Sequence, residues 1–185
     1  MSGPDRIEGF AIVSADGMLA DATGVQPDVL RIEADQKFFH AGLARAHVLA
    51  HGRNSGEDGP QAAGRLRLIL TRKIATLARD KQNPNALHWN PAGASLEQAW
   101  RMLAPKGGTL AVIGGTDVFG LFLEHGYDVF YLSCVPGVRL PGGRPVFPDV
   151  PAHTPDNLLA SHGLKAGAPA ILDARTGATL VAWRR

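Results

Sequence analysis

The stretch Leu110-Ala-Val-Ile-Gly-Gly-Thr-Asp-Val-Phe119 places two consecutive glycines directly after a short apolar run. The apolar run predicts a buried strand, and the residues after the glycines predict the start of a helix. A strand that leads through glycines into a helix brings bare peptide N–H groups and a positive helix N-terminus to the carboxyl edge of a sheet, where the phosphates of a nucleotide can bind. A tight strand-to-helix turn accounts for the glycines equally well, so the motif by itself leaves both interpretations open.

The apolar run of this stretch extends over residues 108–113, and further short apolar runs predict strands at residues 9–14, 46–50, 66–70 and 129–135. Segments with helical spacing lie between several of these runs. The two clearest are 29–45 and 95–104, and the second opens with the capping-box pattern Ser95-Leu-Glu-Gln98. Alternating strands and helices favour an α/β fold with a mainly parallel sheet covered on both faces.

The last third of the chain has a different pattern, because prolines are frequent and two apolar runs flank Arg175-Thr-Gly177 within residues 170–183. This pattern predicts an antiparallel hairpin at one edge of the sheet. Residues 60–64 and 81–91 are interpreted as surface loops rather than domain boundaries. The 185 residues therefore predict a single domain over 1–185.

Charge and apolar run length exclude several classes of partner. The 19 Lys and Arg against 17 Asp and Glu give a net charge of +2, which is too small and too evenly spread to indicate nucleic-acid binding. No apolar stretch reaches the roughly 18 residues that a membrane-spanning helix requires, and the polar amino terminus lacks the apolar core of a signal peptide. The single Cys134 is compatible with a reducing compartment. We therefore expect a cytoplasmic protein without a membrane or nucleic-acid partner, and the sequence leaves a homodimer open.

Histidine and cysteine spacings do not resemble a metal site. His47 and His51 bracket a predicted strand, where they would lie about 13 Å apart at roughly 3.3 Å per residue, too far to share one ion. We expect no metal, and Cys134 is interpreted as a buried structural thiol. His51 directly precedes Gly52 and is a candidate for facing a cofactor.

A carboxylate and two aromatic rings share one face of the first predicted helix, since Asp35, Phe38 and Phe39 stand at positions i, i+3 and i+4. The carboxylate of such a pair can accept paired hydrogen bonds from the N–H edge of a flat heterocycle, while a ring packs against its plane. A solvated Asp beside two core phenylalanines explains the same pattern. Glu33 is a competing carboxylate.

Hydrogen-bond donors follow two consecutive predicted strands. Gly52 ends one of them, and Arg53, Asn54 and Ser55 stand at the expected start of a helix; the next strand ends in Leu70-Thr-Arg-Lys73. A single basic loop of this kind is commonly only a solvated surface. Two of them at one sheet edge favour a dianionic phosphate, such as the 2'-phosphate of NADP.

The order of these segments resembles dihydrofolate reductase and its relative, the reductase domain of riboflavin biosynthesis, which share one fold. The resemblance covers roughly residues 7–150. It rests on the helix carboxylate with an aromatic one turn later, a Gly-Arg-x-Ser motif, a Leu-Thr-Arg motif, an Ile-Gly-Gly motif joined by a cis peptide, a strand hydroxyl and a late Phe-Pro-Asp. In this sequence these are Asp35 and Phe39; Gly52, Arg53 and Ser55; Leu70, Thr71 and Arg72; Ile113, Gly114 and Gly115; Ser133; and Phe147, Pro148 and Asp149.

The resemblance implies a dihydrofolate reductase-like three-layer α/β fold, mainly parallel with an antiparallel C-terminal edge, and an oxidoreductase that transfers hydride from NADPH to a small-molecule substrate, a pterin or a pyrimidine. It implies Asp35 as the catalytic residue and a substrate pocket formed by Ile12, Phe39, Ile113 and Ser133. The implied cofactor-binding residues are Gly52, Arg53, Asn54, Ser55, Thr71, Arg72, Gly114, Gly115, Thr116, Asp117, Val118 and Phe119, where Phe119 takes the place of a pocket aromatic.

The sequence also departs from the dihydrofolate reductase pattern. The usual Pro-Trp pair before the catalytic helix is missing, because Pro27 is followed by Asp28, and the segments 13–20 and 141–147 look closer to the riboflavin branch. The leading hypothesis is reduction of a pterin such as dihydrofolate. The alternatives are reduction of a ribosylaminopyrimidine, reduction of another pterin such as a methanopterin-like compound, and a nucleotide-binding protein without turnover.

Overall fold

The structure, a computed structural model, describes residues 3–55 and 64–185. Its strands are β1 (Arg6–Ser14), β2 (Met18–Ala20), β3 (Val48–Gly52), β4 (Leu66–Leu70), β5 (Leu77–Arg79), β6 (Ala86–Trp89), β7 (Thr109–Val112), β8 (Val129–Val135), β9 (Arg144–Pro145), β10 (Lys165–Ala166), β11 (Ala170–Asp173) and β12 (Ala178–Arg184). Its helices are the 3-10 turn η1 (Asp28–Leu30), α1 (Glu33–Arg45), α2 (Leu96–Leu103), α3 (Thr116–His125) and α4 (Pro155–Ser161).

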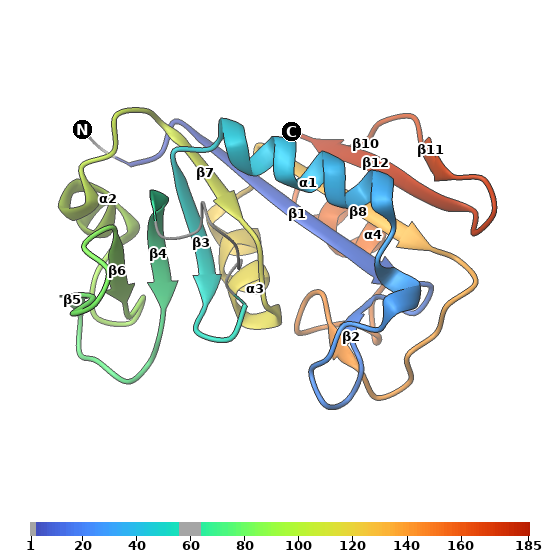
Figure 1. The fold of residues 1–185 in the computed structure, drawn as a ribbon, viewed down its shortest axis with the longest axis horizontal. Coiled ribbons are helices and arrows are strands. Elements are labelled where there is room, and N and C mark those ends of the chain that lie inside the picture. The colour runs from blue at the N-terminus through green and yellow to red at the C-terminus, as the bar shows by residue number, and fades with distance from the viewer. Residues whose placement is uncertain (1–2, 56–63) are drawn as a thin grey trace.

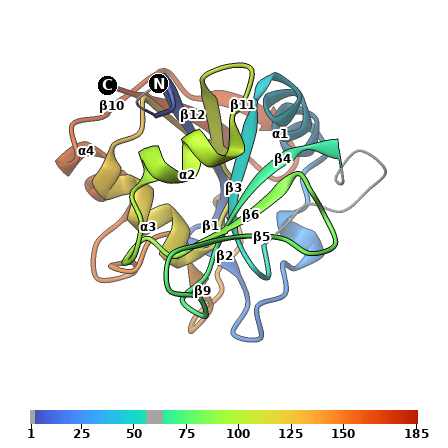
Figure 2. The same cartoon turned by 90° about the vertical axis from the view of Figure 1, so that its left-hand side faces the viewer.

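One large twisted sheet forms the middle layer, in the order β10-β12-β8-β1-β7-β3-β4-β6-β5, with β11 paired to β12. The central pairs are parallel, whereas β12 is antiparallel to β8 and β5 is antiparallel to β6. Helix α1 covers one face, and α2, α3 and α4 cover the other (Figures 1 and 2). The predicted α/β fold with an antiparallel C-terminal edge is confirmed, and a second antiparallel strand closes the opposite edge.

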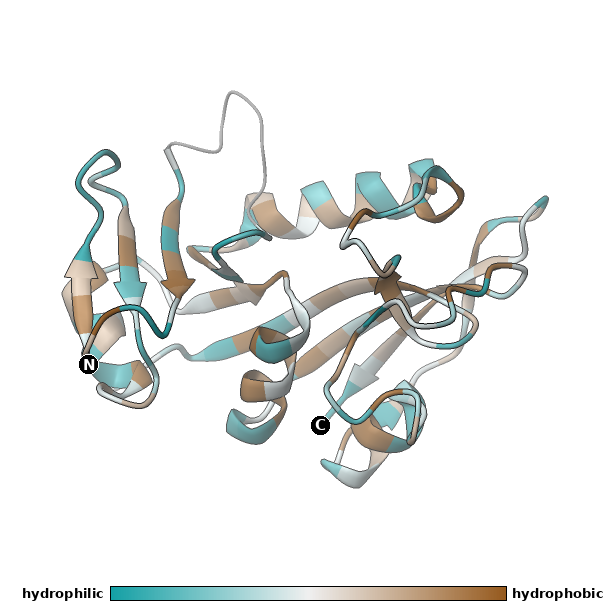
Figure 3. Cartoon of the chain, turned by 90° about the horizontal axis from the view of Figure 1, so that it is seen from below, coloured by the Kyte–Doolittle hydropathy of each residue, from teal (hydrophilic) through white to brown (hydrophobic). Residues whose placement is uncertain are grey.

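Three clusters of buried residues hold these layers together, and the two main ones lie on opposite faces of the sheet. The larger one lies between the sheet and α2–α4, and a smaller one, which includes Phe10, Leu43 and Leu49, lies beneath α1. In Figure 3 the helices carry both hydrophilic and hydrophobic segments, as expected for elements that place one face on the sheet. None of the described helices is long and apolar enough to cross a membrane.

Gly42 allows α1 to pack closely on the sheet. A Cβ atom at this position would lie 2.5 Å from the ring of Phe10. Because that distance is far below van der Waals contact, only a residue without a side chain permits this approach of the helix to β1.

The first predicted helix, 29–45, is shorter in the structure. The turn η1 covers Asp28–Leu30, and α1 begins only at Glu33 because Ile32 is extended, with φ −85° and ψ 122°. Leu30 and Ile32 are both buried in a small cluster with Val135. The break in the helix lets both apolar side chains reach this cluster, so tertiary burial overrides the helical spacing of the sequence.

The interpretation of residues 81–91 as a loop was wrong, because they contain strand β6, which pairs in parallel with β4. Leu87 and Trp89 are almost fully buried, and the Trp89 indole N–H donates to the carbonyl of Ala94 at 2.8 Å. Of the other predicted loop, residues 60–63 lie outside the described residues. The hairpin predicted around Arg175-Thr-Gly177 is confirmed as β11–β12, with Gly177 at φ +74°.

Candidate functional site

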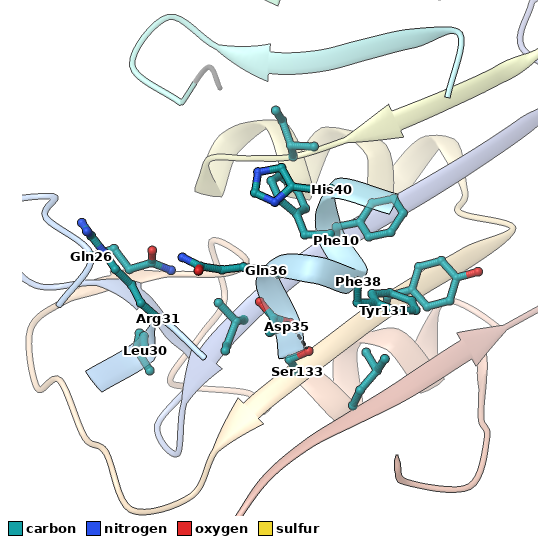
Figure 4. A pocket seen from close by; sticks show the side chains of 15 residues that line it. Phe10, Gln26, Leu30, Arg31, Asp35, Gln36, Phe38, His40, Tyr131 and Ser133 are labelled. Atoms are coloured by element: carbon teal, nitrogen blue, oxygen red, sulfur yellow. Dashed lines mark hydrogen bonds between the residues drawn. The ribbon is translucent and has the colours of Figure 1, made fainter. Parts of the chain in front are cut away.

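A cavity of about 470 Å³ lies between α1 and the sheet, and Figure 4 shows the side chains that line it. Helix α1 contributes one wall and strands β1 and β8 another. The lining includes four of the predicted residues, Ile12, Asp35, Phe39 and Ser133, and a fifth, Ile113, at the end of β7. The sequence therefore identified residues that the fold brings together from four separate elements.

Asp35 is the carboxylate of this cavity. The hydroxyl of Ser133 on β8 donates a hydrogen bond of 2.5 Å to its Oδ1 (Figure 4). Burial raises the pKa of Asp35, and the hydrogen bond from Ser133 opposes part of that rise. A carboxyl group in this environment holds a proton at higher pH than an exposed one, and its oxygens can accept hydrogen bonds from N–H donors of a bound ring.

Glu33, the competing carboxylate, lies outside the cavity. Its side chain is 82% exposed and forms an ion pair of 2.8 Å with Lys37 in the next turn of α1. The hydrogen bond and charge of Lys37 lower the pKa of Glu33. The choice between the two carboxylates follows from the rotation of α1 about its axis, because only the face with Asp35 and Phe39 turns towards the sheet.

Aromatic rings form the deeper wall of the cavity. Phe10 stacks on Tyr131 with ring centroids 5.0 Å apart, and Phe38 meets Tyr131 edge to face, also at 5.0 Å. The rings of Phe39 and Phe10 meet edge to face, with their centroids 6.1 Å apart. Such a wall suits a flat ring system, which can stack on or abut these side chains.

The lining residues that sequence reasoning missed include Phe10, Gln26, Arg31, Gln36, His40 and Tyr131. Phe10 and Tyr131 could have been found, since each precedes a predicted site residue by two positions on the same strand and so faces the same side. Gln36 and His40 follow Asp35 by one and five positions on α1. The positions of Gln26 and Arg31 depend on the path of the loop from β2 to α1. No local sequence pattern predicts that path.

The Gly-Gly motif lies beside the end of β3. The peptide N–H of Gly52 donates to the carbonyl of Gly114 at 2.9 Å, and the Gly114–Gly115 peptide is cis, as the resemblance implies. A Cβ atom on Gly115 would lie 3.2 Å from Oγ of Ser55. The two glycine segments therefore form one narrow cradle of bare backbone at the start of α3, next to the cavity residue Ile113.

The other predicted cofactor residues surround this cradle. Arg72 reaches across from the end of β4 and pairs with Asp117 at 3.4 Å, and both side chains are largely exposed. Thr71 is buried and its hydroxyl accepts a hydrogen bond from the N–H of Lys73 at 3.1 Å. Arg53 and Asn54 are exposed on the turn after β3, and residues 56–63, over which the expected helix would continue, lie outside the described residues.

Three residues near the cradle serve the core instead. Val118 is buried, and Phe119 is 1% exposed and packs edge to face on Phe130 at 5.5 Å, so its side chain is not a pocket wall. This corrects the expectation of a pocket aromatic at Phe119. His51 is also buried, 3.1 Å from the guanidinium of Arg67 through its Nε2. Its ring belongs to the interior of the sheet rather than to an open cofactor surface.

Thr116 connects the glycine cradle to the loops that carry β2 and β9. Its hydroxyl donates to the carbonyl of Pro145 at 2.5 Å, and β9, which ends at Pro145, pairs with β2. The loop after β2 then leads to Gln26 at the rim of the cavity. Among the described residues, no group of three or more His, Cys, Asp or Glu side chains is placed to hold a metal ion.

Comparison with family models finds no match, and no curated protein matches the sequence. The fold, by contrast, is similar to solved structures. A protein described as a riboflavin biosynthesis protein from Shewanella sp. PV-4 aligns over 97% of this chain and 98% of its own, with a TM-score of 0.68 and 18% identity. Dihydrofolate reductase from Enterococcus faecalis, in complex with NADP(H) and RAB-propyl, aligns over 100% of this chain and 99% of its own, with a TM-score of 0.64 and 18% identity.

A third similar structure is a larger enzyme, the diaminohydroxyphosphoribosylaminopyrimidine deaminase/5-amino-6-(5-phosphoribosylamino)uracil reductase from Thermotoga maritima. It aligns over 98% of this chain with a TM-score of 0.62 and 20% identity, and the alignment spans 56% of the larger chain. All three alignments extend over 97% or more of this chain. The chain therefore has a dihydrofolate reductase-like fold.

Proposed function

We propose that this protein is an NADPH-dependent reductase that transfers hydride to a pterin such as dihydrofolate. The observation that carries the proposal is the position of Asp35, hydrogen-bonded to Ser133 inside an aromatic-walled cavity, with the glycine cradle at its border. When bound, the cofactor supplies a hydride from its nicotinamide ring.

The cradle fits the phosphates of a dinucleotide. Gly52, Gly114 and Gly115 present backbone without side chains, and the first residues of α3 follow directly. Helix N-termini and bare peptide N–H groups bind phosphate well. Arg72, and Arg53 on the turn after β3, add cations at the same sheet edge and would hold the extra phosphate that distinguishes NADPH from NADH.

Asp35 holds the heterocycle in this proposal. Its carboxylate accepts hydrogen bonds from the ring N–H and exocyclic amine of the substrate, which raises the proton affinity of the ring nitrogen to be reduced, and water carries the proton. Ser133 keeps the carboxylate in place, while Phe10, Phe39 and Tyr131 exclude water and align the flat ring. We place the reaction in the cytoplasm, where NADPH is available and a single free cysteine is compatible with reducing conditions.

A ribosylaminopyrimidine is the second candidate substrate. The cation of Arg31 and the polar side chains of Gln26 and Gln36 lie at the mouth of the same cavity (Figure 4), and they suit a hydroxylated or phosphorylated sugar. Two of the similar folds also belong to proteins named for riboflavin biosynthesis or for a uracil reductase.

Oxidation of NADPH distinguishes these candidates. The purified protein is mixed with NADPH and either dihydrofolate or the ribosylaminopyrimidine, and the loss of NADPH absorbance is followed. We expect turnover with dihydrofolate, and a fall in kcat of about 100-fold or more in Asp35→Asn with NADPH binding unchanged. Glu33→Gln serves as the matched control and should retain activity.

The possible results separate the hypotheses cleanly. Turnover of the pyrimidine alone would reject the pterin assignment and retain the reductase. A third result is that the protein binds NADPH and turns over none of the three compounds, namely dihydrofolate, the ribosylaminopyrimidine and a methanopterin-like pterin. That result would indicate a nucleotide-binding protein without catalysis, and Asp35→Asn would then leave NADPH binding unchanged.

A further inference from the structure

His51 is a buried histidine that the proposed reaction does not use, although it directly precedes Gly52 of the glycine cradle. It is 4% exposed, and both of its ring nitrogens have partners. Nδ1 lies 2.7 Å from the carbonyl oxygen of Gly52, and Nε2 lies 3.1 Å from a guanidinium nitrogen of Arg67 on β4. The ring therefore connects a buried cation to the backbone of the cradle.

The chemistry of these two partners fixes the position of the imidazole proton. A carbonyl oxygen can only accept a hydrogen bond, so Nδ1 carries a proton and donates to Gly52. A guanidinium nitrogen can only donate, so Nε2 carries no proton and accepts from Arg67. His51 is therefore neutral, with its proton on Nδ1. A second proton, on Nε2, would set two donors and two cations against each other inside the sheet.

The pairing of β3 with β4 brings the two side chains together. In the parallel register Arg67 pairs with Leu49 and His51 pairs with Ile69, so Arg67 and His51 stand on the same face of the sheet. Arg67 is 6% exposed, so its hydrogen bond to the ring is shielded from water. A buried ring that is hydrogen-bonded at both nitrogens keeps one orientation and one tautomer.

The Gly52 carbonyl belongs to the turn that carries two of the proposed cofactor residues, Arg53 and Ser55. This carbonyl also accepts the N–H of Ser55 at 3.2 Å, which closes the turn, while the N–H of Gly52 donates to the carbonyl of Gly114 at 2.9 Å. A carbonyl oxygen has two lone pairs, and here His51 and Ser55 use one each. Because this carbonyl and the Arg53 N–H belong to one planar peptide, holding the carbonyl also sets the direction of that N–H.

We propose that His51 is a positioning residue for the cofactor. It acts through the Gly52 carbonyl and holds the turn that carries Arg53 and Ser55 beside the glycine cradle. Arg67 keeps the proton of His51 on Nδ1. The inference rests on the proposed binding of NADPH and adds to it a buried residue that acts through the backbone. When the turn is loosened, the cofactor must order it on binding, so the cost falls on cofactor affinity.

Two amide substitutions separate the two hydrogen bonds of His51. The amide of His51→Asn lies near the position of Nδ1 and still donates to Gly52, whereas the amide of His51→Gln lies near Nε2 and still accepts from Arg67. Fluorescence titration of the full chain with NADPH should show about tenfold weaker binding in His51→Gln, and binding within about threefold of wild type in His51→Asn. Thermal unfolding should show the opposite order, with the larger loss of stability in His51→Asn, because Arg67 loses its acceptor on the ring.

His47→Gln is the matched control, because His47 stands just before β3 at the opposite edge of the sheet and accepts the N–H of Thr109 at 3.2 Å. It should leave NADPH affinity unchanged.

Nitrogen-15 NMR tests the position of the proton in the wild type without any substitution. It should show a protonated Nδ1 and an unprotonated Nε2 for His51 at neutral pH. Wild-type protein that binds no NADPH would reject the proposed function itself. Where the wild type does bind NADPH, three results would each overturn the role of His51: unchanged affinity in His51→Gln, affinity that falls in step with stability in both variants, or a proton on Nε2.

Discussion

The Ser133 hydroxyl on β8 lies 2.5 Å from the carboxylate of Asp35 on α1, although 98 residues separate them in the sequence. This contact joins the helix layer to the sheet layer inside the cavity. It also orients one carboxylate oxygen and leaves the other available to a ligand. Because burial and this hydrogen bond act on the pKa of Asp35 in opposite directions, the pair sets the protonation of the proposed site.

Removal of the Ser133 hydroxyl should raise the pKa of Asp35. The hydrogen bond favours the ionised carboxylate, so Ser133→Ala leaves burial unopposed. We expect the limb of the pH profile of kcat/KM that reports Asp35 to move to higher pH, as should the carboxyl signal of Asp35 in an NMR titration. Ser161→Ala, on α4, removes a hydroxyl far from the cavity and should leave the profile in place; a shift as large as that of Ser133→Ala would contradict the assignment.

Asp35→Asn should stabilise the folded protein at neutral pH. The pKa of Asp35 is higher in the folded than in the unfolded state, so its stabilising contribution is complete below the unfolded-state pKa and is lost as the pH rises through the folded-state pKa. The neutral amide avoids this loss. Urea unfolding should give a higher free energy of unfolding than wild type at pH 7, and no difference at a pH below about 4.

Glu33→Gln provides the matched comparison for this stability effect. Lys37 lowers the pKa of Glu33, so its contribution is present above the unfolded-state pKa and is lost as the pH falls through the folded-state pKa. The glutamine variant should not gain stability at pH 7. A gain equal to that of Asp35→Asn would mean that burial of Asp35 is not the cause.

Arg72 and Asp117 should have opposite effects on the affinity for NADPH. Arg72→Ala removes a cation expected to bind the extra phosphate, and we expect NADPH to bind about tenfold more weakly while NADH is little changed. Asp117→Asn removes the carboxylate that holds Arg72 at 3.4 Å and that repels a phosphate, so NADPH should bind more tightly. Fluorescence titration with both nucleotides measures these changes, and equal weakening of NADPH and NADH in Arg72→Ala would reject the role of Arg72.

Gly42→Ala should destabilise the protein even though alanine favours a helix. The added Cβ would lie 2.5 Å from the ring of Phe10, and overpacking of this kind costs about 1–3 kcal/mol, against a helix-propensity gain of about 1 kcal/mol. Thermal and urea unfolding measure the net loss. Ala44→Gly, at an exposed position on the same helix, should cost only the propensity difference, and an increase in stability for Gly42→Ala would refute the packing argument.

Local patterns in the sequence predicted the principal strands and the glycine motif. The runs near β1, β3, β4, β7 and β8 alternate with helical segments, and a parallel sheet buried on both faces requires continuous apolar strands. The capping box at the start of α2 is likewise confirmed, with the side chain of Ser95 accepting from the N–H of Gln98 at 3.2 Å. These features depend on residues close together in the chain, so the sequence contains them directly.

Strand β6 could not be predicted in the same way. Its four residues include the half-buried His88, whose ring lies 2.8 Å from Asp80 on the turn before it. The strand forms because β4 offers an unpaired edge to Leu87 and Trp89. Such pairing is a property of the neighbouring strand, and no periodicity within 81–91 shows it.

The sequence by itself determined which chemistry the chain carries: a helix carboxylate with an aromatic one turn later, cations after strands, and glycines that expose backbone. Only the tertiary structure decided that Asp35 rather than Glu33 faces the cavity, that Phe119 belongs to the core, and that Arg72 meets Asp117. The physical reason is that residue type sets what a side chain can bind, whereas its direction depends on how a helix is rotated against the sheet. That rotation follows from the burial of distant residues, such as Ile32 against Val135 and Phe10 beneath Gly42.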